Sequence, residues 1–229
     1  AMALEGVPSF IFSSTAAVFG EPEQVPIDET HPTRPINAYG ETKLAIERAL
    51  PHYDRAYGLR SVCLRYFNAA GADPEGQIGE DHRPERHLIP LALAAATGGP
   101  PLEVFGDDYP TPDGTCLRDY IHVTDLAQAH LLALDGLEAG RPSAVYNLGN
   151  GRPYSVREVI ASVARVTGRE VRHDLAPRRP GDPAVLYASS ARIKADLGWA
   201  PLYEDLDTIV QTAWRWLDDH PAGYQESPA

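Results

Sequence analysis

A strand, a long helix and a second strand follow one another early in the chain, and this order most constrains the fold. Residues 10–12 form a short apolar run, and residues 61–67 form a longer one. Between them Ile46, Leu50 and Tyr53 recur at intervals of four and three residues, as on an amphipathic helix. Two apolar strands joined by a crossover helix predict neighbouring parallel strands covered by helices. The sequence therefore predicts an α/β fold.

Hydroxyl, phenol and ammonium groups are expected at the carboxyl edge of this sheet. Ser13, Ser14 and Thr15 follow the first strand, where open α/β folds place their ligands. Tyr39 and Lys43 lie four residues apart on the helix, so they share one face and the Lys43 charge favours the phenolate form of Tyr39. A tyrosine and a lysine at this spacing also occur by chance on many helices. Their position beside the strand end favours a hydride-transfer site.

Composition narrows the classes of partner. The chain has 229 residues, 43% of them hydrophobic, and a formal net charge of −12. This charge argues against general nucleic-acid or anionic-membrane binding, and no segment approaches the ~20 apolar residues that span a bilayer. Only Cys63 and Cys116 occur, without the spacing of a zinc site. We therefore expect a cytoplasmic protein that binds small molecules.

A metal site is not expected in the acidic loop around residue 110. Asp107, Asp108 and Asp113 supply carboxylates, but Pro110 and Pro112 interrupt the alternating pattern of an EF-hand loop. The candidate site residues are therefore expected to work without a metal ion.

The chain is expected to comprise two domains and to be the back portion of a longer enzyme. The sequence contains no glycine-rich turn for a dinucleotide pyrophosphate. Residues 68–84 are rich in glycine, proline and acidic residues, which indicates a boundary near residue 70. We therefore predict the back part of a Rossmann-like doubly wound parallel sheet in residues 1–70, and a smaller α/β substrate-binding domain in residues 71–229. Strand 145–149 is expected to return to the first sheet.

One long motif and several shorter ones resemble a known family. Residues 108–123 read DYPTPDGTCLRDYIHV, and the shorter matches are SSTAAVFG at 13–20, RYFNAAG at 65–71, YNLG at 146–149, RRPGD at 178–182 and LGW at 197–199. In this order they resemble the UDP-glucose (UDP-galactose) 4-epimerases of the extended short-chain dehydrogenase/reductase superfamily. The resemblance implies NAD-dependent epimerisation at C4 of a UDP-hexose through a 4-keto intermediate. It also implies a homodimer, and a fragment that is inactive without the family's N-terminal part.

The resemblance assigns roles at the strand end. Tyr39 is implied as the catalytic base that takes the sugar 4-hydroxyl proton, and Lys43 as a ligand of the nicotinamide ribose. Thr15 stands where the family holds the 4-oxygen and relays its proton. Ser13 and Tyr66 match positions near the nicotinamide.

The resemblance places the substrate on the later segments. Arg118 and Arg179 align with residues that pair with the UDP diphosphate, a task suited to the guanidinium fork. Asn68 and Leu88 match contacts on the diphosphate side.

Four further positions complete the implied substrate site. Phe105 matches a uracil contact and Asp182 a ribose-hydroxyl acceptor. His87 stands where many relatives have asparagine. Leu186 aligns with a gate at which a bulky tyrosine excludes N-acetylated sugars and a small residue admits them, so acceptance of UDP-GlcNAc stays open.

Other interpretations remain open at this point. A sugar-nucleotide 4,6-dehydratase would carry acidic residues where Ala16 and Ala17 stand, so epimerisation is favoured. A UDP-xylose/UDP-arabinose 4-epimerase resembles the chain nearly as well, and a non-catalytic UDP-sugar-binding module is a hypothesis of a different class. Phe105 and Leu88 have the residue types of an ordinary core, and His122 is expected to be structural.

Overall fold

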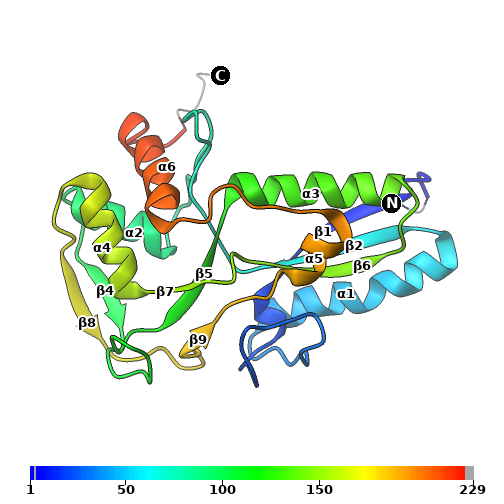
Figure 1. Cartoon of the computed structure of the whole chain (residues 1–229), viewed down its shortest axis with the longest axis horizontal. Coiled ribbons are helices and arrows are strands. Elements are labelled where there is room, and N and C mark those ends of the chain that lie inside the picture. The colour runs from blue at the N-terminus through cyan, green and yellow to red at the C-terminus, as the bar shows by residue number, and fades with distance from the viewer. Residues whose placement is uncertain (3, 225–229) are drawn as a thin grey trace.

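A three-stranded parallel sheet with helices on both faces forms one region of the molecule (Figure 1). The computed structural model describes residues 1–2 and 4–224. The sheet contains β1 (Ser9–Thr15), β2 (Arg60–Tyr66) and β6 (Ala144–Leu148), in the order β1-β2-β6. Helix α1 (Ala38–Tyr57) covers one face and α3 (Val123–Glu138) the other (Figure 1). This arrangement confirms the predicted α/β fold with parallel strands.

A second region contains the shorter strands (Figure 1). Central β5 (Leu117–His122) pairs in parallel with β3 (Asn68–Ala70) and β9 (Val185–Leu186), and antiparallel with β7 (Pro153–Ser155). A separate parallel pair joins β4 (Leu102–Phe105) to β8 (His173–Ala176). Because β3 begins two residues after β2 ends, the two regions meet at the carboxyl end of β2.

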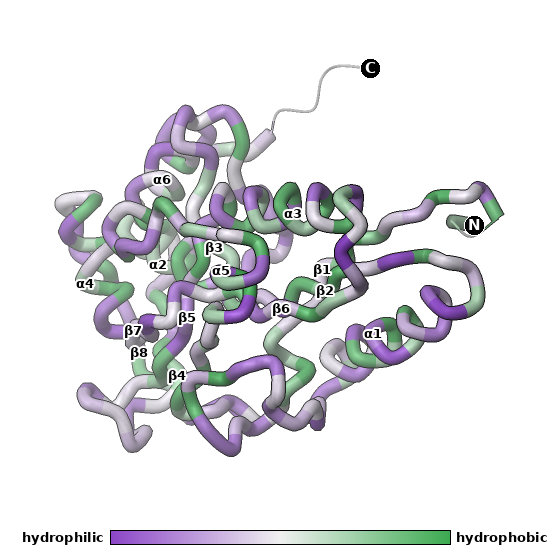
Figure 2. The backbone as a smooth tube through the Cα atoms, turned by 45° about the vertical axis from the view of Figure 1, so that its right-hand side comes forward, coloured by the Kyte–Doolittle hydropathy of each residue, from purple (hydrophilic) through white to green (hydrophobic). Residues whose placement is uncertain are grey.

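The remaining helices of the described chain are shorter than α1 and α3. They are the 3-10 helix η1 (Ala16–Val18), α2 (Leu88–Ala96), α4 (Val156–Thr167), α5 (Ala191–Leu197) and α6 (Leu206–Asp219). Ser155 and Glu158 form a capping box at the start of α4. Gly168 ends α4 in the left-handed conformation, at a φ of 67°, which glycine adopts without strain. Figure 2 shows hydrophobic and hydrophilic residues alternating along α1 and α3.

Each region is stabilised by its own apolar cluster. One packs the parallel sheet against α3, with Leu64, Ala133 and Leu148 fully or almost fully buried. The other packs α2, α4 and α6 together, through residues such as Leu93 and Ile209. Burial of this kind contributes about 25 cal/mol per Å² of apolar surface, so these clusters fix the strand ends that carry the candidate site.

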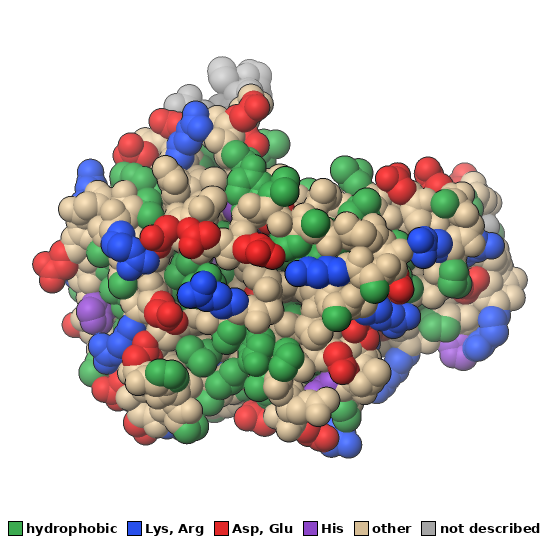
Figure 3. Space-filling view, viewed as in Figure 1, with side chains coloured by type: hydrophobic (Ala, Val, Ile, Leu, Met, Phe, Trp, Pro, Cys, Tyr) green, Lys and Arg blue, Asp and Glu red, His purple; other side chains and the backbone are tan. Residues whose placement is uncertain are grey.

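The surface carries charges of both signs. Figure 3 shows acidic and basic side chains interspersed over one face, with a group of hydrophobic side chains near its centre. Within residues 1–2 and 4–224, none of the helices combines the length and hydropathy that crossing a membrane requires.

Candidate functional site

The start of α1 is fixed in position by its cap and by a close backbone approach. Asn37 Oδ1 accepts a hydrogen bond of 2.8 Å from the Gly40 amide. A Cβ atom on Gly40 would lie 2.4 Å from the carbonyl oxygen of Ala17 in η1, closer than two such atoms can approach. Glycine at position 40 therefore lets α1 pack against the segment that follows β1. This contact sets the position of Tyr39, whose residue is 55% exposed.

Lys43 joins α1 to the end of β1. Its Nζ donates a hydrogen bond of 3.0 Å to the Ser13 carbonyl and lies 5.6 Å from the centre of the Tyr39 ring. Thr15 caps η1, because its Oγ1 accepts a hydrogen bond of 3.1 Å from the Ala17 amide. In the sheet Thr15 lies opposite Tyr66. The five residues expected at the strand end are therefore carried by two adjoining parallel strands and the helix that packs on them.

His130 is a residue of this site that sequence reasoning did not single out. Its Nε2 lies 3.1 Å from Ser13 Oγ, and its Nδ1 lies 2.8 Å from the Leu126 carbonyl oxygen. Because a carbonyl only accepts, Nδ1 carries a proton and donates to Leu126, and Nε2 is the ring atom that faces the Ser13 hydroxyl. In the sequence, His130 is a polar residue on the apolar face of α3. That position is typical of a residue packed in the core, so the sequence alone does not mark His130 as part of a site.

A buried charge network underlies the strand end and was also missed. Glu47 of α1 and Arg65 of β2 are only 8% and 7% exposed. Arg65 donates to both Glu47 carboxylate oxygens, with bonds of 2.5 to 3.1 Å, and Ser14 Oγ donates to Glu47 Oε1 at 2.5 Å. This network ties α1 to both β1 and β2, so it fixes the helix that carries Tyr39 and Lys43.

A pocket in the second region collects most of the residues expected to bind substrate. Its cavity volume is about 660 Å³. Seven of the expected residues line it, and they are Asn68, His87, Leu88, Phe105, Arg118, Arg179 and Asp182. Leu186 is not among the lining residues and instead packs against the core cluster around Phe19 and Ile27. Asn68 follows Tyr66 by two residues, so the pocket adjoins the carboxyl end of β2.

The polar groups of the pocket engage one another. Arg118 and Asp182 form a short ion pair, and Asn68 Nδ2 donates a hydrogen bond of 2.8 Å to the Asp119 carbonyl. Arg179 lies over the Phe105 ring, 3.7 Å from its centre, in a cation–π contact. Within the described residues, Arg118 pairs with Asp182 and not with its chain neighbour Asp119. A ligand that takes the place of Asp182 on Arg118, or of Arg179 on the Phe105 ring, therefore replaces an existing contact.

Both cysteines have buried thiols. Cys116 lines the pocket, and burial raises the pKa of its thiol. Burial also raises the pKa of Cys63, in β2, to about 12. Each thiol stays protonated and unreactive at neutral pH, because the thiolate is the nucleophilic form. Cys63 packs in an apolar cluster with Phe12 and Leu50.

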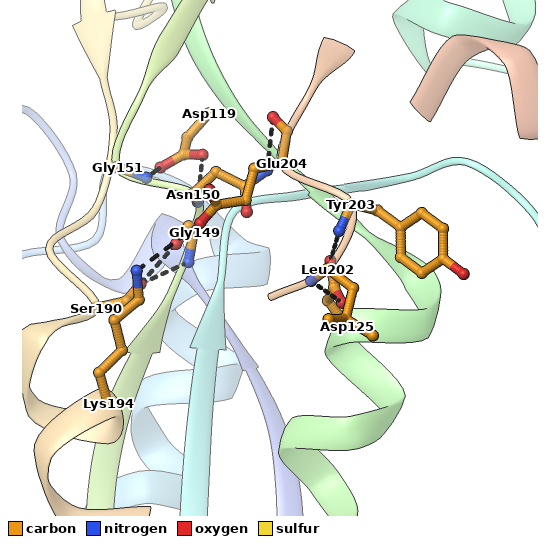
Figure 4. Close-up of polar contacts among 10 residues, drawn as sticks. All are labelled: Asp119, Asp125, Gly149, Asn150, Gly151, Ser190, Lys194, Leu202, Tyr203 and Glu204. Carbon is orange, nitrogen blue, oxygen red and sulfur yellow. Dashed lines mark hydrogen bonds and ion pairs between the residues drawn. The ribbon is translucent and has the colours of Figure 1, made fainter. Parts of the chain in front are cut away.

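A buried aspartate fastens the pocket strands to the first sheet (Figure 4). Asp119 accepts hydrogen bonds of 2.8 to 3.1 Å from the amides of Asn150, Gly151 and Ala188. Burial raises the pKa of Asp119 to about 6, although these three bonds oppose the shift. A Cβ atom on Gly149 would lie 2.3 Å from the carboxylate, so glycine is required there. This junction positions Arg118, the neighbour of Asp119 in β5.

A second aspartate holds the segment before α6 (Figure 4). Asp125 accepts from the amides of Leu202 and Tyr203 at 2.8 and 2.9 Å. The Tyr203 ring stacks on His122, with 4.3 Å between ring centres, and His122 Nε2 lies 3.0 Å from Thr212 Oγ1. His122 is fully buried and satisfied, which confirms its predicted structural role.

Comparison with known proteins places this site in a family context. Residues 1–149 match the NAD dependent epimerase/dehydratase family. A UDP-glucose 4-epimerase of Halalkalibacterium halodurans is 56% identical over 219 residues, which are 95% of this chain and 66% of the relative. The chain thus spans about two thirds of the length of that relative.

Solved structures agree with the sequence comparison. The UDP-glucose 4-epimerase of Brucella ovis, in complex with NAD, matches with a TM-score of 0.91 at 52% identity, covering 93% of this chain and 66% of that one. The enzyme of Bifidobacterium longum, in complex with NAD+ and UDP, matches with a TM-score of 0.91 at 38% identity, covering 97% of this chain and 67% of that one.

Proposed function

This chain belongs to the NAD dependent epimerase/dehydratase family, and from that premise we propose that the complete protein interconverts UDP-glucose and UDP-galactose through a 4-keto sugar. One observation carries the proposal. Tyr39 and Lys43 lie at the carboxyl end of β1, while the adjoining pocket is lined by residues suited to a nucleoside diphosphate. We further propose that these 229 residues alone are inactive, because they span 66% of the relative's length.

The side chains at the strand end fit the nicotinamide end of NAD. They offer the Ser13 hydroxyl, the Lys43 ammonium and the Tyr66 phenol on adjoining elements. NAD supplies the hydride acceptor and donor for C4 when it is bound. Tyr39 takes the proton of the sugar 4-hydroxyl as the general base, and Thr15 holds the 4-oxygen and relays that proton. Lys43 binds the nicotinamide ribose and stabilises the negative charge that forms on Tyr39.

The pocket binds the nucleotide part of the substrate and leaves the hexose free to rotate. Arg118 and Arg179 pair with the diphosphate, and Asn68, His87 and Leu88 contact the same side. To do so, Arg118 exchanges its pair with Asp182 for the phosphate oxygens.

The nucleoside end uses the remaining pocket residues. Phe105 packs on the uracil after Arg179 moves from its ring, and Asp182, released from Arg118, accepts from the ribose hydroxyls. Both changes couple nucleotide binding to rearrangement of the same four side chains.

Two observations bear on the rival reactions. Ala16 and Ala17, directly after Thr15, have no group that could transfer a proton, which disfavours a 4,6-dehydratase. Leu186 is intermediate in size at the proposed hexose gate, so UDP-GlcNAc and UDP-pentoses remain candidate substrates. We expect Leu186→Tyr to lower kcat/KM for UDP-GlcNAc far more than for UDP-galactose, since the added ring takes the space of the acetamido group.

We also propose a homodimer. Helix α1 exposes Ile46, Tyr53 and Tyr57 with exposed fractions of 40%, 46% and 68%. An apolar helix face of this kind supports association of two copies through α1.

The proposed function is tested by separating reaction products. The complete protein is incubated with NAD and, in turn, UDP-galactose, UDP-GlcNAc and UDP-xylose. We expect UDP-glucose from UDP-galactose. Loss of water from the sugar would indicate a dehydratase, and nucleotide binding without any product would indicate a binding module.

A further inference from the structure

Four potential metal ligands converge in the loop between β3 and α2. They are Glu80, His82, Glu85 and His87, and their ligand atoms all lie within 4.8 Å of one another. Nδ1 of His82 lies 3.7 Å from Glu85 Oε1, and Nδ1 of His87 lies 3.5 Å from the same oxygen. The two imidazole rings stack with 5.3 Å between their centres. One short stretch of chain therefore presents two nitrogens and two carboxylates at one point.

These separations suit a tetrahedral metal ion. Zn–N and Zn–O bonds of about 2.0–2.2 Å put the ligand atoms around zinc about 3.4 Å apart. The two histidine–Glu85 distances are close to this spacing. The ion pair of Glu80 with His87 is shorter and has to open slightly around an ion. Side-chain rotation suffices, because the side chains of His82 and His87 are 49% and 59% exposed.

The carboxylate of Glu85 and the backbone of Glu80 are held in place, and in the described part of the chain neither carboxylate pairs with a lysine or arginine. Glu85 Oε1 accepts hydrogen bonds of 2.6 and 2.7 Å from the amides of Arg86 and His87, and the Glu80 carbonyl accepts from Trp216 Nε1 at 3.1 Å. Among the described residues, the ion pairs of Glu80 and Glu85 are all with histidines. Neighbouring Arg83 pairs with Asp81 instead.

We infer that Glu80, His82, Glu85 and His87 form a binding site for one divalent transition-metal ion of the Zn²⁺ class. Two imidazoles and two carboxylates favour such an ion over Mg²⁺ or Ca²⁺, which take oxygen ligands. The site lies at the rim of the pocket, because Glu80 and His87 also line it while His82 and Glu85 do not. A bound Zn²⁺ neutralises two carboxylates at this rim.

Zinc titration of the 229-residue chain, without nucleotide, tests the site directly. Isothermal calorimetry with Zn²⁺ is expected to show one ion per chain, and Mg²⁺ is expected to give no saturable binding. His82→Ala removes a ligand that is largely exposed and is expected to weaken Zn²⁺ binding about tenfold or more. His52→Ala is the matched control, since His52 is an exposed histidine of α1 that contacts Arg55. Absence of saturable Zn²⁺ binding, or equal Zn²⁺ affinities of the two variants, overturns the site.

A second titration tests what the ion does, and this part rests on the proposed function. Removing the repulsion between two carboxylates and a diphosphate is expected to tighten UDP binding about fivefold in the presence of Zn²⁺. His82→Ala lies outside the pocket lining, so it is expected to bind UDP as the unmodified chain does without Zn²⁺ and to show no zinc effect. Equal UDP affinities with and without Zn²⁺ overturn the coupling and leave the metal site standing. Failure to bind UDP under either condition counts against the proposed function instead.

Discussion

The strand end and the pocket hold their functional side chains in different ways. At the strand end, Lys43 bonds to the backbone of β1, and the helix that carries it is tied to the sheet by the buried pair of Glu47 and Arg65. In the pocket, Arg118 pairs with Asp182, which is itself expected to bind ligand. On the proposed function, this difference predicts that the reacting groups are set before ligand binds, whereas the binding groups exchange partners when it arrives.

The largest expected effect is the loss of the proton-transferring oxygen at the strand end. Tyr39→Phe keeps the aromatic ring and its contact with Lys43 but removes the phenolic hydroxyl. General acid–base groups typically contribute about 10² to 10⁴ in rate, so we expect turnover of UDP-galactose to fall by that factor. The measurement is kcat of the full-length protein, with UDP affinity as a parallel readout.

A control on the same helix separates chemistry from packing. Tyr57→Phe makes the same change at a residue that is 68% exposed, near the far end of α1. We expect its kcat to match that of the unmodified protein. Near-normal epimerase activity in Tyr39→Phe would remove Tyr39 from the mechanism.

The next effect concerns the network that sets the strand end. Glu47→Ala leaves the Arg65 guanidinium buried without its carboxylate partner, and breaking a buried pair in this way costs about 3–5 kcal/mol. Glu23→Ala breaks an ion pair with Arg34 whose side chains are 56% and 74% exposed, so a loss of about 0–1 kcal/mol is expected. Urea unfolding of both variants measures the difference. Similar losses would mean that the strand end is not preset by its buried network.

Substitution of a pocket residue is expected to weaken ligand binding more than it lowers stability. Arg118→Ala should weaken UDP binding by about ten- to a hundredfold, the usual worth of a charged hydrogen bond. The unfolding free energy should change less than in Glu47→Ala, because the Asp182 left behind is partly exposed. Calorimetric titration with UDP measures the change in affinity, and urea unfolding measures the change in stability. A large loss of stability with unchanged UDP affinity would make Arg118 a structural residue.

The sequence predicted the elements whose signals are local. The apolar runs predicted β1 and β2, and the spacing of Ile46, Leu50 and Tyr53 predicted α1. The long motif around Arg118 supplied the family, which comparison with known proteins supports. The individual roles of the candidate site residues remain predictions.

Contacts between distant residues were outside the reach of the sequence. Ser13 and His130 are 117 residues apart, and the pairing of Arg118 with Asp182 spans 64 residues. Such pairs depend on strand order and register, which periodicity does not specify. His82 was missed for a different reason, because the cluster around it depends on the conformation of an irregular loop.

The smallest expected effect is a change in how the unfolding free energy depends on pH, and it comes from Asp119 at the junction of the two regions. Burial raises the pKa of Asp119 from 3.8 to about 6, so between these values the folded protein binds a proton that the unfolded chain has released. The contribution of Asp119 to stability is therefore present below pH 3.8 and is lost as the pH rises through about 6. Its slope is at most about 1.4 kcal/mol per pH unit.

Asp119→Asn is expected to remove this slope from urea-unfolding free energies measured between pH 4 and 6, even where the variant is less stable throughout. In the control Asp28→Asn, the slope in this window should stay, because hydrogen bonds from the side chain and backbone of Thr30 lower the pKa of Asp28 below 3.8. If Asp119→Asn keeps the slope of the unmodified protein, the carboxylate is ionised throughout this range, and its three backbone bonds rather than its burial govern the junction.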